Sequence, residues 1–123
     1  MVRAVWRDDD GRSQIVHLGS GSGSTMLGIY TATAVDFLRL LAVGYRELAF
    51  PDDFARTLEQ VADEAGEPML PAPEALRAWL AKTFGATAPD RASELVVDVA
   101  DMDADASDDP FWTWAHTLPR WQK

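Results

Sequence analysis

The sequence predicts one α+β domain over residues 1–123: an N-terminal antiparallel or mixed sheet of about three strands, packed against several C-terminal helices. Two observations predict this class. Runs rich in β-branched residues are grouped near the N-terminus, and amphipathic periods typical of helices fill most of the remaining chain. Strands grouped first and helices later favour α+β over alternating α/β.

The expected strands lie at 2–7, 13–18 and 25–30. The first two are joined by the acidic, Gly-containing connection 8–12, which suits a hairpin. Gly19 to Ser24 joins the second to the third. A phosphate-binding loop is one reading of this segment, but no Lys-Ser/Thr pair follows it and the next element reads as a strand. We therefore expect a flexible turn between strands.

The clearest helix follows the third strand. Apolar residues recur there at spacings of three and four, namely Ala34, Phe37, Leu38, Leu41 and Tyr45. Thr33 is in position to cap its start and Asp36 suits its first turn. Gly44 provides the left-handed stop, so this helix should be a core element with defined ends.

Three further helices are expected at 51–66, 76–85 and 90–102. Gly66 and Gly85 should end the first two, and Asp90 should cap the third. That third helix is inferred from the spacing of Leu95, Val96, Val99 and Met102. A final short helix should begin at Asp109-Pro110, a cap followed by a first-turn proline, and end by Pro119.

The order of these elements resembles the SUKH superfamily, also called Smi/Knr-like, which includes bacterial immunity proteins and fungal cell-wall-synthesis regulators. The resemblance rests on a strand ending in Leu-Gly-Ser at 18–20, the Gly-rich turn, another strand, and Asp-Phe-Leu-Arg-Leu-Leu-Ala-x-Gly-Tyr at 36–45. The segments 76–89, 92–100 and 110–112 are similar to the C-terminal end of such domains.

The resemblance covers most of residues 13–115. Family members usually carry a helix and further strands ahead of the first hairpin, so this chain would be an N-terminally shortened or a divergent member. The resemblance implies a protein-binding module, most concretely an immunity protein that binds and blocks a cognate toxin, often a nuclease. An intracellular adaptor or regulator without a toxin partner is the alternative that the fungal relatives imply.

Charge is distributed unevenly along the chain. Residues 1–50 carry five acids and five arginines, whereas residues 51–123 carry fifteen acids against six bases, which accounts for the net charge of −9. Such a field repels nucleic acid and attracts basic surfaces, so the sequence favours a basic protein partner and disfavours nucleic-acid binding. Solubility alone is the simpler explanation of the same charge.

Acids and aromatic residues gather near the C-terminus, and they supply the candidate partner-binding residues Asp101, Asp103, Asp105, Asp108, Asp109, Trp112, Trp114 and Trp121. The carboxylates would steer a basic partner and the tryptophans would anchor it. Two alternatives stay open. The acidic run is otherwise a solvated linker, and Phe111 and Trp112 otherwise pack into the core while Trp114 and Trp121 cover its edge.

A second alternative function is metal-assisted hydrolysis by the carboxylates of 101–109. A calcium loop would need glycine where Ala106 stands and glutamate where Trp112 stands, so we expect no metal site. His17 and His116 are the only histidines, no nucleophile motif is present, and cysteine is absent. We expect packed or surface histidines, no enzyme activity and no cofactor.

The N-terminus has no signal-peptide pattern and no apolar run reaches the length of a membrane span, so the expected location is the cytoplasm. The cysteine-free composition fits a reducing compartment. Residues 2–7 could leave an open sheet edge, and pairing of two such edges is the hypothesis for a homodimer.

Overall fold

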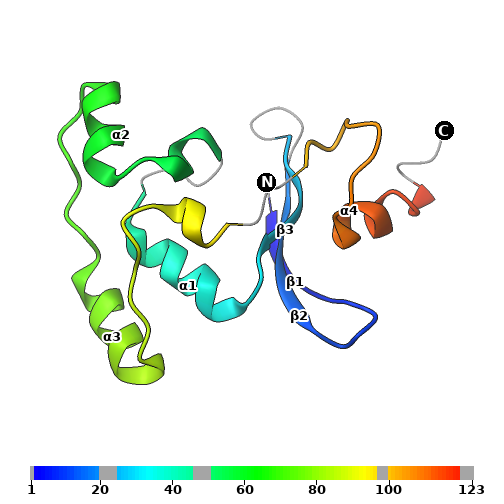
Figure 1. Ribbon diagram of the computed structural model, residues 1–123, viewed down its shortest axis with the longest axis horizontal. Helices are drawn as coiled ribbons and strands as arrows, with labels where there is room; N and C mark the ends of the chain where they lie inside the picture. The colour runs from blue at the N-terminus through cyan, green and yellow to red at the C-terminus, as the bar shows by residue number, and fades with distance from the viewer. Residues whose placement is uncertain (1, 20–24, 46–50, 97–99, 120–123) are drawn as a thin grey trace. The chain divides into compact units, whose positions relative to one another are not determined.

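The computed structural model describes residues 2–19, 25–45, 51–96 and 100–119. A three-stranded antiparallel sheet at the N-terminus is followed, within these residues, by four α-helices and two short 3-10 helices (Figure 1). The predicted α+β class is confirmed. The chain forms two compact units, residues 1–34 with 97–123 (unit 1) and residues 35–96 (unit 2).

The sheet of unit 1 has the order β1 (Val2–Arg7), β2 (Ser13–Leu18), β3 (Leu27–Thr31). The first two strands match the prediction, and the third is shifted from the expected 25–30. In the hairpin turn the Gly11 N–H donates to the Asp8 carbonyl at 3.0 Å. Gly11 has a φ of 80°, a conformation that favours glycine.

The outer edge of β3 is bonded to a distant segment of the chain. The Leu27 N–H donates to the Ala100 carbonyl at 2.8 Å, and the Met102 N–H donates to the Thr25 carbonyl at 2.7 Å. Met26 and Asp101 form an antiparallel bridge between them. The helix predicted over 90–102 is therefore wrong: residues 100–102 bond to the edge of β3 instead, because strand-edge groups give their backbone a partner.

The 3-10 helix η2 (Ala92–Glu94) is the only helical turn described in that predicted range, and residues 97–99 lie outside the described residues. The Leu95 N–H closes the turn on the Ala92 carbonyl at 2.8 Å. Asp90 was expected to cap a helix here, but the residue before η2 is Arg91, which is extended and makes no side-chain capping bond.

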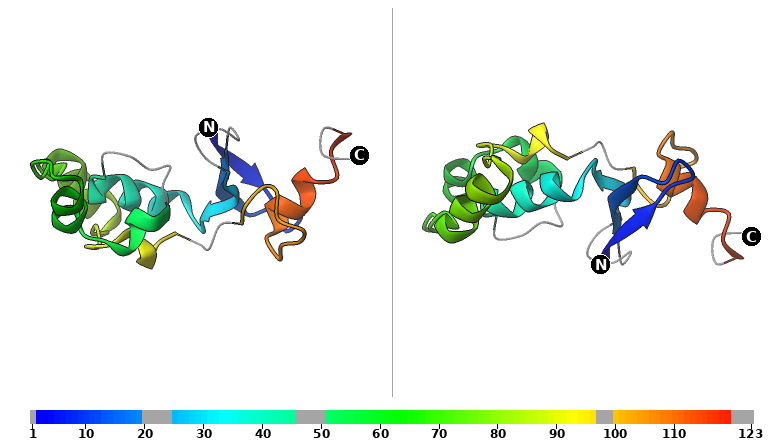
Figure 2. Two further views of the ribbon diagram at one scale, coloured as in Figure 1. Left: turned by 90° about the horizontal axis from the view of Figure 1, so that it is seen from above. Right: turned by 90° about the horizontal axis from the view of Figure 1, so that it is seen from below.

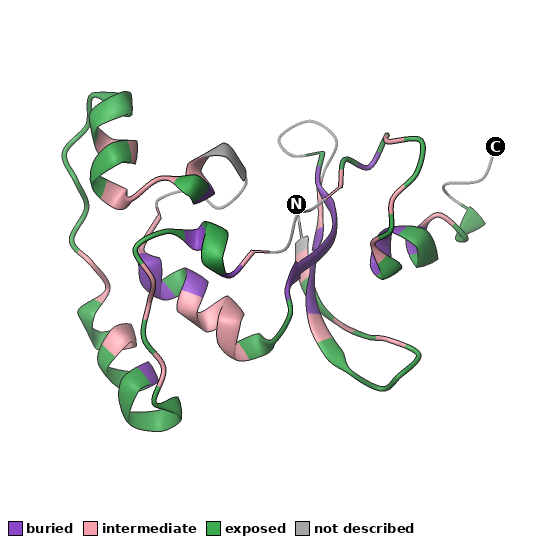
Figure 3. Ribbon diagram, viewed as in Figure 1, coloured by how far each residue is buried: buried purple, intermediate pink, exposed green. Residues whose placement is uncertain are grey.

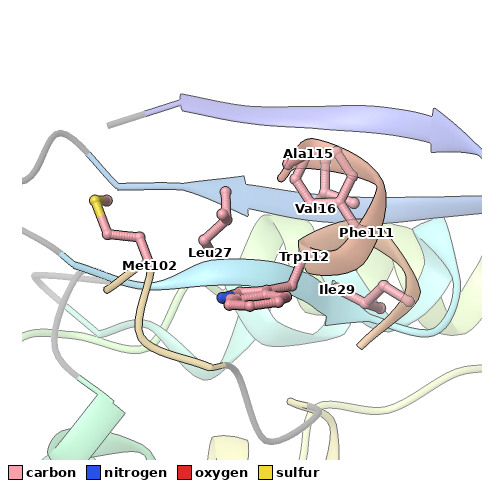
Figure 4. Close-up of a cluster of buried hydrophobic side chains, with 7 residues drawn as sticks. All are labelled: Val16, Leu27, Ile29, Met102, Phe111, Trp112 and Ala115. Carbon is pink, nitrogen blue, oxygen red and sulfur yellow. The ribbon is translucent and has the colours of Figure 1, made fainter. Parts of the chain in front are cut away.

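Helix α4 (Pro110–Ala115) packs against β3 and completes the core of unit 1 (Figures 1 and 2). Asp109 caps the helix and Pro110 opens it, as predicted. Its buried side chains meet those of β2 and β3 in the cluster of Figure 4, which consists of Val16, Leu27, Ile29, Met102, Phe111, Trp112 and Ala115. The core therefore joins sequence segments about a hundred residues apart.

Unit 2 contains most of α1 (Ala34–Val43), then η1 (Pro51–Ala55), α2 (Leu58–Ala65) and α3 (Glu74–Phe84). The stops predicted at Gly44, Gly66 and Gly85 are confirmed, since all three have positive φ. The helix predicted over 51–66 is divided in two. Thr57 accepts from the Gln60 N–H and Gln60 accepts from the Thr57 N–H, and this capping box starts a new helix.

Two side chains tie the helices of unit 2 together. Arg77 of α3 donates to the carbonyls of Ala42 and Val43, at 2.8 and 3.2 Å, and so satisfies the C-terminal end of α1. The Tyr45 hydroxyl donates to the Arg56 carbonyl at 2.6 Å and accepts from the Ala92 N–H at 3.0 Å. Burial is the main cause that raises the pKa of Tyr45.

Candidate protein-binding site

Three aromatic rings of unit 1 form a series from its core to its surface. Trp6 of β1 lies 5.4 Å from Phe111 and 6.0 Å from Trp114, between ring centroids, and the two helix rings are 5.7 Å apart. Phe111 is buried, Trp6 is half-buried and Trp114 is 45% exposed. Packing against the inner rings holds the exposed indole in place, so it offers a preorganised apolar surface.

An open cleft of about 440 Å³ lies beside these rings. It is formed where the β1–β2 hairpin approaches α4, and its lining consists of Trp6, Asp8, Asp9, Asp10, Arg12, Pro110, Thr113 and Trp114. Positions 110, 113 and 114 share one face of α4 because residues three and four apart on a helix are neighbours. We call this feature the hairpin–helix cleft.

The hairpin carboxylates of the cleft are organised by the turn itself. Asp8 Oδ1 accepts from the backbone N–H groups of Asp10 and Arg12, at 3.0 and 2.9 Å, and Asp8 Oδ2 lies 3.2 Å from Arg12 Nε. The Arg12 backbone N–H is the largest cause of the lowered pKa of Asp8. Asp10 lies 3.1 Å from Arg12 Nη2, and Asp9 is exposed.

The cleft lining thus contains three carboxylates and a single guanidinium, and its charge is negative. A negative cleft with an exposed indole suits a Lys or Arg side chain, because the cation can lie over the ring while it pairs with a carboxylate. Arg12 is 70% exposed, and it pairs with Asp10, whose side chain is 77% exposed, and with Asp8, whose side chain is 9% exposed. An exposed ion pair contributes little. A guanidinium from a partner can therefore compete for Asp10 and can pair with the exposed Asp9.

The structure assigns internal bonds to two of the acids predicted to steer a partner. Asp109 Oδ1 accepts from the N–H groups of Phe111 and Trp112, and its Oδ2 accepts from the Ile29 N–H. Asp101 Oδ1 accepts from the Asp103 N–H at 2.8 Å, and a hydrogen bond from the Thr25 side chain is the largest cause of its lowered pKa. Both carboxylates act as parts of the fold.

Asp103, Asp105 and Asp108 are exposed on the segment that leads into α4. They remain the members of the predicted acidic run whose position suits long-range attraction of a basic partner. Within the part of the chain that the structure describes, no group of three or more His, Cys, Asp or Glu side chains could hold a metal ion.

The predicted tryptophans have different environments. Trp112 is 8% exposed, and its Nε1–H donates to the Asp101 carbonyl at 3.0 Å. It is a core residue together with Phe111, which confirms the alternative in which both pack inside. Trp114 is the predicted anchor that lies on the surface, and Trp121 lies outside the described residues.

Both histidines are packed. His17 is fully buried, its ring centroid lies 5.3 Å from that of Tyr30, and Arg3 lies over the same tyrosine at 5.0 Å. Burial, and then the Arg3 charge, lower the pKa of His17 to about 4. His116 stacks on Trp112 at 3.8 Å, with its ring nitrogens near the Trp112 and Met102 carbonyls.

Sequence reasoning missed the hairpin half of the site. It treated Asp8 to Asp10 as turn residues and Trp6 as a strand residue, and it grouped Trp114 with the acids nearest to it in sequence. The usable signal was an aromatic residue one position before the end of a strand, Trp6, together with the three acids that follow the strand. That signal does not identify the helix on which the partner ring lies.

Comparison of the chain with protein-family models, curated proteins and solved structures gave no significant match. No helix among the described residues is long and apolar enough to cross a membrane.

Proposed function

We propose that the chain is a protein-binding module of the SUKH type, and specifically an immunity protein that binds a basic toxin domain, such as a nuclease, and blocks it. The observation that supports this best is the hairpin–helix cleft, where an ordered, 45% exposed Trp114 lies beside acidic residues. Tryptophan is among the residues that contribute most to binding energy at protein interfaces.

The cleft also supports a partner of a particular chemistry. A nuclease must carry basic residues where it binds phosphates, and those residues match a cleft that contains carboxylates and an indole. Binding there would cover the basic site and exclude its substrate, so inhibition would occur by occlusion. The exposed Asp103, Asp105 and Asp108 would accelerate encounter at low salt without forming the central contact.

The first experiment is affinity capture of the tagged chain from its source cells, with washes at low and then high salt and identification of retained proteins by mass spectrometry. A retained basic toxin domain should then be purified and its activity titrated with the chain. Equimolar chain should abolish that activity. Retention of housekeeping or envelope-synthesis proteins would support the adaptor alternative instead.

Matched variants test whether the captured partner binds at the hairpin–helix cleft. Trp114→Ala should lose the partner, whereas Trp79→Ala should retain it, because Trp79 is similarly exposed (47%) but belongs to α3 in unit 2. Equal retention of the partner by both variants would exclude the cleft as its binding site. Failure of the captured protein to be inhibited would exclude the immunity function while leaving the cleft as a binding site.

A further inference from the structure

Unit 2 contains a groove of about 330 Å³ that the proposed function does not use. One wall is α2, and the others come from the end of α1, from Tyr45 and Asp53, and from the connector after Gly66. The α2 side chains in the groove are Leu58, Val61, Ala62 and Ala65. Their spacing of three, one and three residues places them on one face of the helix. We call this feature the α2 groove.

The apolar face of α2 is not buried, although its pattern is that of a helix packed against a core. None of its eight residues is buried, and Figure 3 shows α2 only in the colours of exposed and intermediate residues. Apolar side chains continue into the connector, where Met69 is 57% and Leu70 is 38% exposed. A contiguous apolar stripe of this kind marks an interaction surface more often than a solvated one.

The surroundings of the α2 groove are acidic. Residues 58–70 include Glu59, Asp63, Glu64 and Glu67 and contain no Lys or Arg. Asp53, in the groove lining, lies 3.3 Å from Arg56 Nη1, and Glu64 lies 3.0 Å from Arg56 Nε. One guanidinium is thus shared by two carboxylates. The groove lining itself contains the carboxylates of Asp53 and Glu67 and no Lys or Arg among its described residues, so this acidic rim carries a negative charge.

We propose that the α2 groove binds a basic amphipathic helix of a protein partner. Apolar side chains three or four residues apart on that helix would enter the groove, and Lys or Arg side chains flanking them would face the acidic rim. The volume is at the lower end of ligand pockets, which begin at about 300 Å³, so it suits a few anchoring side chains. Ala62 and Ala65 leave room for the partner helix to approach closely.

This site is separate from the hairpin–helix cleft, because all its lining residues belong to unit 2. The test uses the full chain and a labelled synthetic helix of about five turns, built from Leu and Lys with one apolar stripe. Two control peptides have the same length: one with the same composition in scrambled order, and one with Glu in place of Lys. The measurement is fluorescence anisotropy at low and moderate salt.

The striped basic peptide should bind at least about tenfold more tightly than either control. Val61→Lys, which places a cation in the groove, should weaken that binding at least about tenfold, while Trp79→Ala on α3, outside the groove lining, should leave it unchanged. Equal binding of the striped and scrambled peptides would overturn the proposal, since simple charge attraction would then account for it.

A second variant tests the groove independently, so that the result does not depend on the folding of Val61→Lys. Glu67→Gln alters an exposed carboxylate of the groove lining and should weaken the striped peptide at low salt while leaving the circular dichroism spectrum unchanged. If both variants bind as the unaltered chain does, the α2 groove is not the site. Tight binding of a small apolar ammonium compound without binding of any peptide would also contradict the proposal.

Discussion

Replacement of Asp109 by Ala should strongly destabilise unit 1, because one carboxylate joins its last helix to its sheet. Oδ1 accepts from the Phe111 and Trp112 N–H groups at 2.9 and 3.0 Å, and Oδ2 accepts from the Ile29 N–H at 2.8 Å. The first two bonds cap α4. The third satisfies a donor on β3, where Ile29 is 6% exposed.

The magnitude follows from these two roles. Loss of a helix cap costs about 1 kcal/mol, and an unsatisfied buried backbone donor costs about 1–3 kcal/mol. Asp109→Ala should therefore reduce the free energy of unfolding by about 2–4 kcal/mol. Asp109→Asn keeps one side-chain oxygen as a capping acceptor but loses the second, so its cost should be intermediate. Asp108→Ala is the matched control, since Asp108 is exposed, and should change stability by less than about 0.5 kcal/mol.

The assay is urea unfolding of the three variants, followed by tryptophan fluorescence and by circular dichroism, so that a difference between units would appear as non-coincident transitions. The expected order of stability is Asp108→Ala, then Asp109→Asn, then Asp109→Ala. Equal stability of Asp109→Ala and Asp108→Ala would show that the Asp109 carboxylate does not link α4 to β3.

Three further predictions concern other parts of the chain. His17 has a folded-state pKa of about 4 against 6.5 in the unfolded chain, so the unfolded state binds more protons between these two pH values. Up to about 3 kcal/mol of stability should therefore be lost as the pH falls from 6.5 to 4. Urea unfolding at several pH values should show that the stability of His17→Gln depends less on pH than that of the unaltered chain. Gly44→Ala should lower the free energy of unfolding by about 2 kcal/mol or more in the same assay, because φ is 100° and the new Cβ would lie 2.9 Å from Pro73 Cδ. Gly66→Ala, which has open space around the new Cβ, should lower it by about 1 kcal/mol. Equal losses of stability in the two variants would contradict the steric argument. Antiparallel pairing of two β1 edges about Val5 would set Arg3 of one chain opposite Arg7 of the other, and like charges in that position repel. Because salt screens this repulsion, the hypothetical homodimer should be more stable at high salt. Sedimentation that shows a monomer at every salt concentration would exclude the dimer.

Local chemistry made much of the fold readable from the sequence. Gly44, Gly66 and Gly85 end helices because each can adopt positive φ, and Asp109-Pro110 starts one because cap and first-turn proline are adjacent. The error at 51–66 had a local cause as well. Thr57 and Gln60 form a capping box, whose spacing is visible in the sequence but was outweighed by the apolar period running through Phe54.

The remaining errors have tertiary causes. The residues from Leu95 to Met102 carry a helical spacing, yet 100–102 bonds to the edge of β3, whose backbone groups lie about seventy-five residues earlier in the chain. The candidate site is similar, since Trp114 lies beside Asp8 to Asp10 only after α4 packs on the sheet. Asp109 was counted among the partner-binding acids because its bond to Ile29, 80 residues away in the sequence, cannot be read from the local pattern.

The most direct test of the proposed binding function is the affinity of the captured basic partner for the hairpin–helix cleft, measured by calorimetric titration of the purified partner. Trp114→Ala should weaken binding by about 2 kcal/mol or more, and Asp9→Asn with Asp10→Asn should weaken it at low salt. Trp79→Ala should bind as the unaltered chain does. Unchanged affinity of Trp114→Ala, with the partner still bound by the folded variant, would contradict the assignment of this cleft.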